Sequence, residues 1–319
     1  MKQVLDNGFG MACGDFFLGL VSCIGMIWTF TLPVVAQEAA PDNKSLEAEN
    51  AQKRLDFMNK AMARNELAIL GKTEIPSKLI PAPLLRWSSV EGNVKDGGLY
   101  GFTRGGRLDV VMQFPLHSET FTVQEFVATC EQPISMKRDG QEFWRYDSPS
   151  IEWNVLPDAK PPHESKTART VQFRQLAESF EIQIDHGQKT FVRQPLRLLR
   201  QPVHRYQDLD IGAVDGAVFA FVLETDPEAI LMLEACQSDT GPQWRYAVTE
   251  MTVNALEVTR NGKKVWEKPD HRVFCQSFVK HYTCPYRPLP DDVSLKGTLK
   301  MSTAVPAAAG PTPTPARAK

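Results

Sequence analysis

One pattern occurs twice in this chain, and this repetition constrains the fold more than any other feature of the sequence. The first copy begins at Asp96 and the second at Asp215. The matching segments, in order, are 96–102 with 215–221, 110–112 with 230–232, and 138–144 with 260–266. Their offset drifts only from 119 to 122 residues, and chance rarely preserves both order and spacing. The sequence therefore predicts two copies of one supersecondary unit.

Each copy is expected to consist of short antiparallel strands. In the first copy these are expected at 99–103, 107–114, 121–129, 134–137 and 141–145. The pairs Asp139-Gly140 and Asn261-Gly262 predict a tight hairpin near the end of each copy, because such a turn needs positive φ at both central residues. A copy of about fifty residues buries too little apolar surface to be stable alone, so we expect one domain.

Two helices are expected outside the copies. Apolar residues recur at helical spacing within 45–70, and they do so again between the copies at Phe173, Leu176, Ala177 and Phe180. The predicted fold class is α+β: an antiparallel sheet-rich core built from a duplicated strand unit, with one N-terminal and one central helix.

The N-terminus predicts export. Residues 16–36 carry no ionisable side chain and end in Val34-Val35-Ala36, a small-residue pattern typical of signal peptidase cleavage. We expect cleavage after Ala36 and a secreted or periplasmic protein. Two alternatives remain open: an uncleaved membrane anchor, because the segment is long enough to span a bilayer, and a lipoprotein through Cys23.

This gives the expected organisation of the whole chain. It comprises a signal peptide over 1–36, an N-terminal helix and Pro-rich connector over 37–83, a duplicated core domain over 84–290, and a disordered tail rich in Ala, Pro and Thr over 291–319.

Several ordered segments also resemble a known group of proteins. These are 83–88, 196–206, 215–221 and 225–228, which together are similar to segments of uncharacterised exported proteins from planctomycete-type bacteria. The resemblance covers roughly 84–269 and implies export and the extent of the core domain. It implies no catalytic residues, and the segment 270–290 departs from the pattern.

Export changes how the cysteines are interpreted. After cleavage the chain keeps Cys130, Cys236, Cys275 and Cys284 in a compartment that permits disulfides, and four cysteines allow three pairings. We expect a disulfide between Cys275 and Cys284, which would close a short loop. Cys130 and Cys236 lie in apolar, strand-like segments, and for them a disulfide and two buried thiols both remain open.

The same region holds a candidate metal site. The four possible zinc ligands are His271, Cys275, His281 and Cys284. Their intervals are tighter than the usual arrangement of two ligand pairs separated by a loop. A local disulfide beside surface histidines is therefore favoured over zinc, and no cofactor is expected.

A row of basic residues follows the central hairpin. Arg193, Arg197, Arg200 and Arg205 could bind an anionic glycan or phosphate, because guanidinium groups match these anions in a bidentate way. A solvated strand face is the more common explanation of such a row.

Asp96 and Asp215 form a second candidate, a pair of carboxylates placed symmetrically for acid and base catalysis. Each is followed by glycine, however, and Asp-Gly ahead of a strand is typical of a turn. We therefore expect both residues to shape turns.

Charge and motifs leave little else to indicate a function. The net charge of −2 gives no basic field for nucleic acid, and the chain has no nucleophile elbow, phosphate loop or dinucleotide fingerprint. We expect a non-catalytic binding module of the cell envelope whose partner is an envelope protein or a glycan. It would contact a membrane only if the N-terminal segment stays uncleaved. The alternative is a hydrolase with its site between the two copies.

Overall fold

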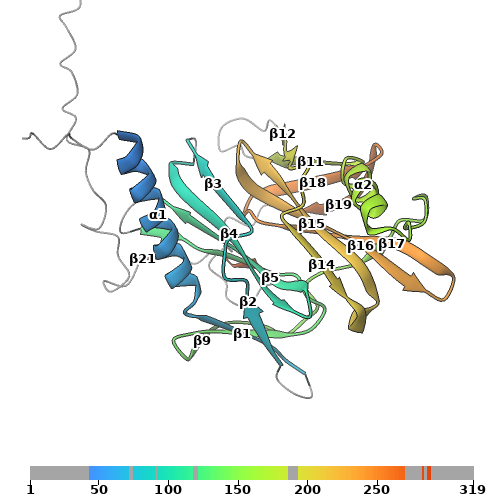
Figure 1. Cartoon of the computed structure of the whole chain (residues 1–319), viewed down its shortest axis with the longest axis horizontal. Coiled ribbons are helices and arrows are strands. Elements are labelled where there is room, and N and C mark those ends of the chain that lie inside the picture. Colours follow the sequence, from blue (N-terminus) through green and yellow to red (C-terminus); the bar gives the residue numbers. More distant parts are fainter. Residues whose placement is uncertain are drawn as a thin grey trace, which may run out of the picture. The chain divides into compact units, whose positions relative to one another are not determined.

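The computed structural model describes residues 43–71, 75–90, 92–117, 121–185, 193–269, 282–283 and 286–288. These residues form an α+β structure of antiparallel sheets with two helices, as the sequence predicts (Figure 1). We call residues 43–146 the first half and residues 166–268 the second half.

The first half begins with a helix and continues with strands. Its elements are α1 (Asn43–Met62), β1 (Asn65–Ile69), β2 (Ile75–Leu79), β3 (Leu85–Ser89), β4 (Val94–Arg104), β5 (Arg107–Leu116), β6 (Phe121–Val123), β7 (Glu125–Ala128), β8 (Ile134–Arg138) and β9 (Gln141–Tyr146). A linker with the short strand β10 (Asn154–Val155) leads to the second half.

The second half has a similar order of elements, with β13 and a 3₁₀ helix in addition and without a strand equivalent to β6. Its elements are α2 (Lys166–Ala177), β11 (Phe180–Asp185), β12 (Arg193–Pro195), β13 (Arg197–Leu198), β14 (His204–Asp208), the 3₁₀ helix η1 (Leu209–Ile211), β15 (Ala213–Leu223), β16 (Asp226–Ser238), β17 (Gly241–Glu250), β18 (Ala255–Arg260) and β19 (Lys263–Lys268). Two short strands, β20 (Tyr282–Thr283) and β21 (Tyr286–Pro288), follow.

The strands of the two halves pair in the same order. In the first half the neighbours are β2-β1-β8-β9 and β3-β4-β5-β7, and in the second half they are β12-β11-β18-β19 and β14-β15-β16-β17. In the first half β2 pairs with both β1 and β4, and the nine strands of this half form one eleven-stranded sheet together with β20, which pairs with β7, and β21, which pairs with β6. In the second half Leu196 interrupts the corresponding stretch, which leaves a six-stranded and a four-stranded sheet.

The pairing registers of β4–β5 and β15–β16 match at an offset of 119 residues, which makes 110–112 equivalent to 229–231, one residue away from the match to 230–232 that the sequence suggested. Phe102 pairs with Val110 and Phe221 pairs with Ala229, and both phenylalanines are buried. The last hairpins, β8–β9 and β18–β19, each have positive φ at both residues of the Asp139-Gly140 or Asn261-Gly262 turn. Each of these hairpins also has an irregularity at the same place along its ladder.

The repeated order extends beyond the segments that the sequence indicated. The first helix ends at Met62 rather than continuing to residue 70, because Asn65–Ile69 pairs on both sides, with β2 and with β8. This tertiary pairing overrides a weak helical preference. Strand β2 lies within the segment predicted as a connector. The central helix and hairpin, α2 with β11, therefore have counterparts in α1 and β1.

The helices and sheets stack in layers. One buried cluster joins α1 to one face of the first sheet, through residues such as Met58, Met62, Tyr100 and Phe114. A second joins α2 to the second sheet in the same manner, including Phe173 and its contact with Trp244. Both faces of the central strands are therefore buried, which explains why β5 and β16 are apolar along most of their length.

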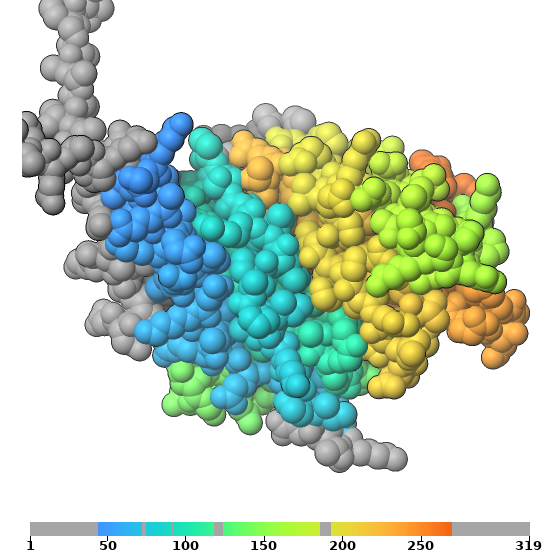
Figure 2. All heavy atoms as spheres, in the orientation of Figure 1, coloured from blue at the N-terminus to red at the C-terminus, as the bar shows by residue number. Residues whose placement is uncertain are grey.

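The remaining faces of the two sheets pack on each other, and we call this contact the seam. Its buried cluster includes Leu99, Leu108, Val111 and Val127 from the first half and Val218, Ala220, Val222, Ile230, Met232 and Ala247 from the second. Figure 2 shows the atoms of the two halves in contact along it.

One carboxylate organises polar contacts at the seam. Glu234 of β16 is fully buried, and Arg107 from the first half donates two hydrogen bonds to it, at 2.8 and 3.0 Å. Arg245 and the Tyr206 hydroxyl also donate to it, each at 2.6 Å. Burial alone would raise the pKa of Glu234, but Arg107, with Arg245 and Tyr206, holds this pKa below its usual value.

Asp96 and Asp215 lie inside β4 and β15 and are buried, so the expectation that they shape turns is wrong. Asp96 accepts hydrogen bonds from Arg54 of α1 and Arg86 of β3. Asp215 makes the equivalent contacts in the second half.

That second set of contacts fixes α2. Arg169 of α2 donates to Asp215 at 2.9 Å, and Arg205 of β14 donates at 2.6 Å. Each aspartate therefore ties a helix to two strands of its sheet. The glycines that follow them serve packing, because a Cβ at Gly97 would come within 2.5 Å of the Trp87 ring, and one at Gly216 within 2.3 Å of the Tyr206 ring.

We expect Glu234→Gln to lower the free energy of unfolding by about 3 kcal/mol at neutral pH, because the buried Arg107 guanidinium loses its buried counter-charge and keeps only the more exposed Glu131, while the partly buried Arg245 loses its partner. The folded-state pKa of Glu234 is lowered, so its stabilisation should be present above the usual glutamate pKa and should be lost as the pH falls. Urea unfolding at several pH values measures both effects. An acid limb as steep in the variant as in the wild type would contradict the assignment.

We expect Asp96→Ala and Asp215→Ala each to cost about 3–5 kcal/mol, because each removes the shared partner of two arginines. A matched control is Arg200→Ala, which removes an exposed pair with Glu178 and should change stability by less than about 0.5 kcal/mol. Chemical denaturation compares the three. A cost near 1 kcal/mol for either aspartate would fit a turn role instead.

Candidate functional site

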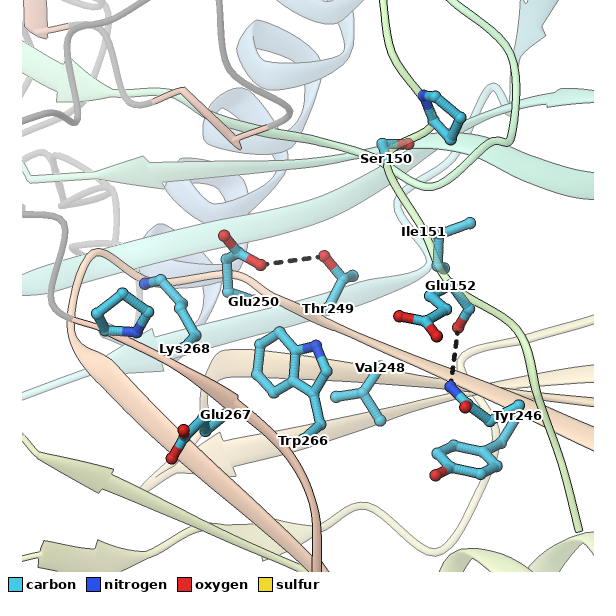
Figure 3. Close-up of a pocket in the computed structure, with 13 residues that line it drawn as sticks. Ser150, Ile151, Glu152, Tyr246, Val248, Thr249, Glu250, Trp266, Glu267 and Lys268 are labelled. Atoms are coloured by element: carbon cyan, nitrogen blue, oxygen red, sulfur yellow. Dashed lines mark hydrogen bonds between the residues drawn. The ribbon is translucent and has the colours of Figure 1, made fainter.

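A groove in the second half is the most site-like hollow that we find in the described part of the chain. It lies between β17, β19 and the linker after β9, and its volume is about 500 Å³ (Figure 3). Its lining residues are Pro149, Ser150, Ile151, Glu152, Asn154, Tyr246, Val248, Thr249, Glu250, Trp266, Glu267, Lys268 and Pro269.

The groove adjoins the place where two aromatic rings of the first half have no aromatic counterpart, and one of the two replacing residues, Val248, lines it. In the first half Phe126 packs against Phe143 and Trp144, with ring centroids 5.5 and 5.9 Å apart, and Trp144 is only 1% exposed. At the equivalent register positions the second half has Val248 and Val265.

The smaller valine side chains leave the equivalent tryptophan partly open. Trp266 is half-buried and lines the groove, with Val248 and Tyr246 beside it (Figure 3). An indole face with apolar neighbours is a surface on which a flat or apolar ligand group packs well.

The polar rim of the groove offers mainly hydrogen-bond acceptors. Glu152 and Glu267 are exposed, and Lys264 holds the pKa of Glu267 below its usual value. Lys268 is buried and turns its ammonium toward the backbone oxygens of Thr252 and Asn254, at 2.5 and 2.8 Å. The exposed charge of the rim is therefore acidic.

The described lining residues do not form a catalytic constellation. The Ser150 hydroxyl donates to the Cys130 carbonyl at 2.6 Å, and Thr249 donates to the buried Glu250 carboxylate at 3.3 Å. None of the described lining residues pairs a hydroxyl or thiol nucleophile with a histidine.

The row of arginines predicted as an anion site is dispersed in the structure. Arg193 pairs with Glu257, Arg200 with Glu178 and Arg205 with Asp215. Arg197 alone of the four lines a second hollow, beside Arg86 and Lys95, and there it donates to the Glu224 carbonyl.

The predicted disulfide and zinc residues lie outside the described residues, as does the apolar segment 16–36. These are His271, Cys275, His281 and Cys284. Within the described part of the chain, no cluster of three or more His, Cys, Asp or Glu side chains could hold a metal ion. None of the helices described there is long and apolar enough to cross a membrane.

Cys130 and Cys236 are free, buried thiols, which resolves the alternatives that the sequence left open. Cys130 donates to the Gln132 carbonyl at 3.2 Å, and Cys236 lies 3.8 Å from Glu234. Burial raises the pKa of each thiol to about 12.

Sequence reasoning missed the groove, although a signal for it was present. At the repeat offset, Phe126 and Phe143 correspond to Val248 and Val265. A loss of aromatic volume in one copy, beside a tryptophan kept in both, indicates an opening in that copy.

No family model, curated protein or solved structure matches the chain.

We expect Cys130 and Cys236 to resist alkylation in the native protein at neutral pH, because burial both blocks access and disfavours the thiolate. Peptide mapping after iodoacetamide treatment, with and without denaturant, separates these two cysteines from the others. Rapid labelling of either one without denaturant would show that its strand opens readily.

Proposed function

We propose that the protein is a non-catalytic binding module of the cell envelope and that the groove lined by Trp266 is its binding site. The observation that carries this proposal is the replacement of a sealed aromatic cluster in the first half by an open groove in the second. A hollow of about 500 Å³ lies in the range of small-ligand sites, and its mixture of aromatic, apolar and carboxylate groups is typical of such sites.

The comparison of the two halves also supports an origin of the chain by duplication. We infer that the halves are copies of one unit comprising a helix and its strands, because pairing order, register and the arginine–aspartate contacts recur at matching positions. In this interpretation the first copy kept a filled interior and the second copy acquired the groove.

The groove favours ligands that donate hydrogen bonds. Glu152 is an exposed acceptor, and Glu267 accepts from Lys264 at 2.8 Å with its second oxygen still available, while the Lys268 ammonium is engaged by two carbonyls. Sugar hydroxyls and the amines of a basic peptide are both donors. An envelope glycan and an envelope protein segment are therefore both suitable partners, whereas a strongly acidic ligand is disfavoured.

A hydrolase remains the second candidate, because two carboxyl groups near the seam have raised pKa values. Burial raises the pKa of Glu228 to about 7, and it raises that of Asp226 well above its usual value. Neither residue lines the groove or the hollow beside Arg86. Because neither carboxyl lines these two hollows, the pair supports a structural role better than a catalytic one.

The proposed site can be tested by refilling it. Val248→Phe and Val265→Phe place in the second half the rings that seal the first, and Trp266→Ala removes the aromatic face. The probes are a soluble oligomer of N-acetylglucosamine and a peptide of alternating Lys and Val, titrated by calorimetry. We expect each variant to weaken binding of the active probe at least tenfold, about 1.4 kcal/mol or more.

Val171→Phe is the matched control, because Val171 is 51% exposed on α2, away from the groove. It should bind like the wild type, and all variants should keep the wild-type thermal midpoint within a few degrees. Binding that survives both valine substitutions, or no binding of either probe, would reject the groove as the site. Turnover of a probe that Asp226→Asn or Glu228→Gln abolishes would favour the hydrolase.

A further inference from the structure

The seam has a second polar contact, between Gln113 of β5 and Asp226 at the start of β16. The Gln113 Nε2 atom donates to Asp226 Oδ1 across the two halves in a short hydrogen bond. Gln113 is only 2% exposed, and its other polar atom, Oε1, is buried and has no hydrogen-bond partner. A buried acceptor without a donor costs free energy, so this amide oxygen requires an explanation.

The groups that surround Asp226 are acidic. Glu228 lies on the same strand, Glu125 belongs to β7 of the first half, and Glu224 lies in the β15–β16 turn. Two cations lie beside this cluster: Lys268 acts on Glu228 and its ammonium is held by two carbonyls, and Arg197 donates to the Glu224 carbonyl at 2.7 Å. Neither forms an ion pair with Asp226, so a negative charge there would face like charges from three elements without a counter-ion of its own.

We propose that Asp226 carries a proton in the folded protein and forms a two-hydrogen-bond acid–amide pair with Gln113. The amide Nε2–H donates to Oδ1, and the carboxyl O–H donates to Oε1. This arrangement gives Gln113 Oε1 a hydrogen-bond donor, and it also removes the negative charge of Asp226 from the acidic cluster. Burial, with Glu228 and Glu125 next, raises the pKa of Asp226 in agreement with this assignment.

This acid–amide pair makes the contact between the two halves at one end of the seam dependent on pH. When the pH rises through the folded-state pKa, the proton passes to solvent and the O–H donor is lost. A carboxylate is then left against Glu228, Glu125 and Glu224. The same turn is held to β3 by Thr225, which donates to the Ser88 carbonyl, and by Ser89, which donates to Glu224 at 3.3 Å. Deprotonation therefore loosens the contact between this turn and the first half.

The sign of the stability effect follows from linkage. The pKa of Asp226 is higher in the folded state than in the unfolded state. Its stabilisation is therefore complete below the usual aspartate pKa and decreases as the pH rises toward and through the folded-state pKa. Glu228, with a pKa raised to about 7, changes stability in the same direction and must be measured separately.

The test compares the full-length wild type with Asp226→Asn, which keeps both hydrogen bonds as an amide–amide pair but cannot titrate. Glu228→Gln is the matched control and removes the contribution of Glu228. The ¹³Cγ shift of Asp226, assigned by its loss in Asp226→Asn, reports protonation directly. Amide hydrogen exchange at Ser89 and Thr225 reports opening of the turn, from about pH 5 to about pH 9.

We expect the Asp226 carboxyl to be protonated at neutral pH in the wild type. Exchange at Ser89 and Thr225, corrected for intrinsic pH dependence, should rise at least tenfold toward the alkaline end. Asp226→Asn should abolish that rise, and Glu228→Gln should retain it. A ¹³Cγ shift already at the carboxylate value at pH 6, or an alkaline rise that persists in Asp226→Asn, would overturn the proposal.

Discussion

The buried carboxylate of Glu234 is the contact on which the joining of the two halves depends. It is fully inaccessible to water and must receive its hydrogen bonds from the protein. Its donors come from β5 of the first half, through Arg107, and from β14 and β17 of the second half. The hydrophobic effect between the apolar faces of the seam is not directional, whereas this carboxylate is satisfied only when all three donors converge. It therefore fixes how the sheets are placed.

The sequence predicted those parts of the fold that depend on local chemistry or on the repeat. The turns at Asp139-Gly140 and Asn261-Gly262 follow from the conformational freedom of adjacent residues. Asp96 was misassigned as a turn residue because its true partner, Arg54, lies 42 residues away on α1. The end of α1 at Met62 was missed for the same reason, since pairing of β1 with β8 decides it. Local rules cannot detect partners that only the fold brings close.

The sequence analysis did not predict the groove, and the reason is a different one. Phe126 and Val248 are both apolar, so a pattern of hydrophobic periodicity does not distinguish between them. A position-by-position comparison of the halves shows that valine replaces a larger phenylalanine ring here. Because this replacement lies beside Trp266, the lost side-chain volume leaves an opening. Where two halves share one order of strand pairing, one half thus serves as the reference for the other. Differences at equivalent positions point to features that composition does not reveal.

The seam is asymmetric in its chemistry, and this asymmetry limits the pH range in which it is fully closed. Arg107 and Asp226 occupy equivalent register positions, as do Pro115 and Glu234, so the ionic contact at one end has no counterpart at the other. Glu234 has a lowered pKa and loses its stabilising charge as the pH falls. Asp226 has a raised pKa and gains a destabilising charge as the pH rises. Because one end weakens in acid and the other in base, both contacts hold together only at intermediate pH.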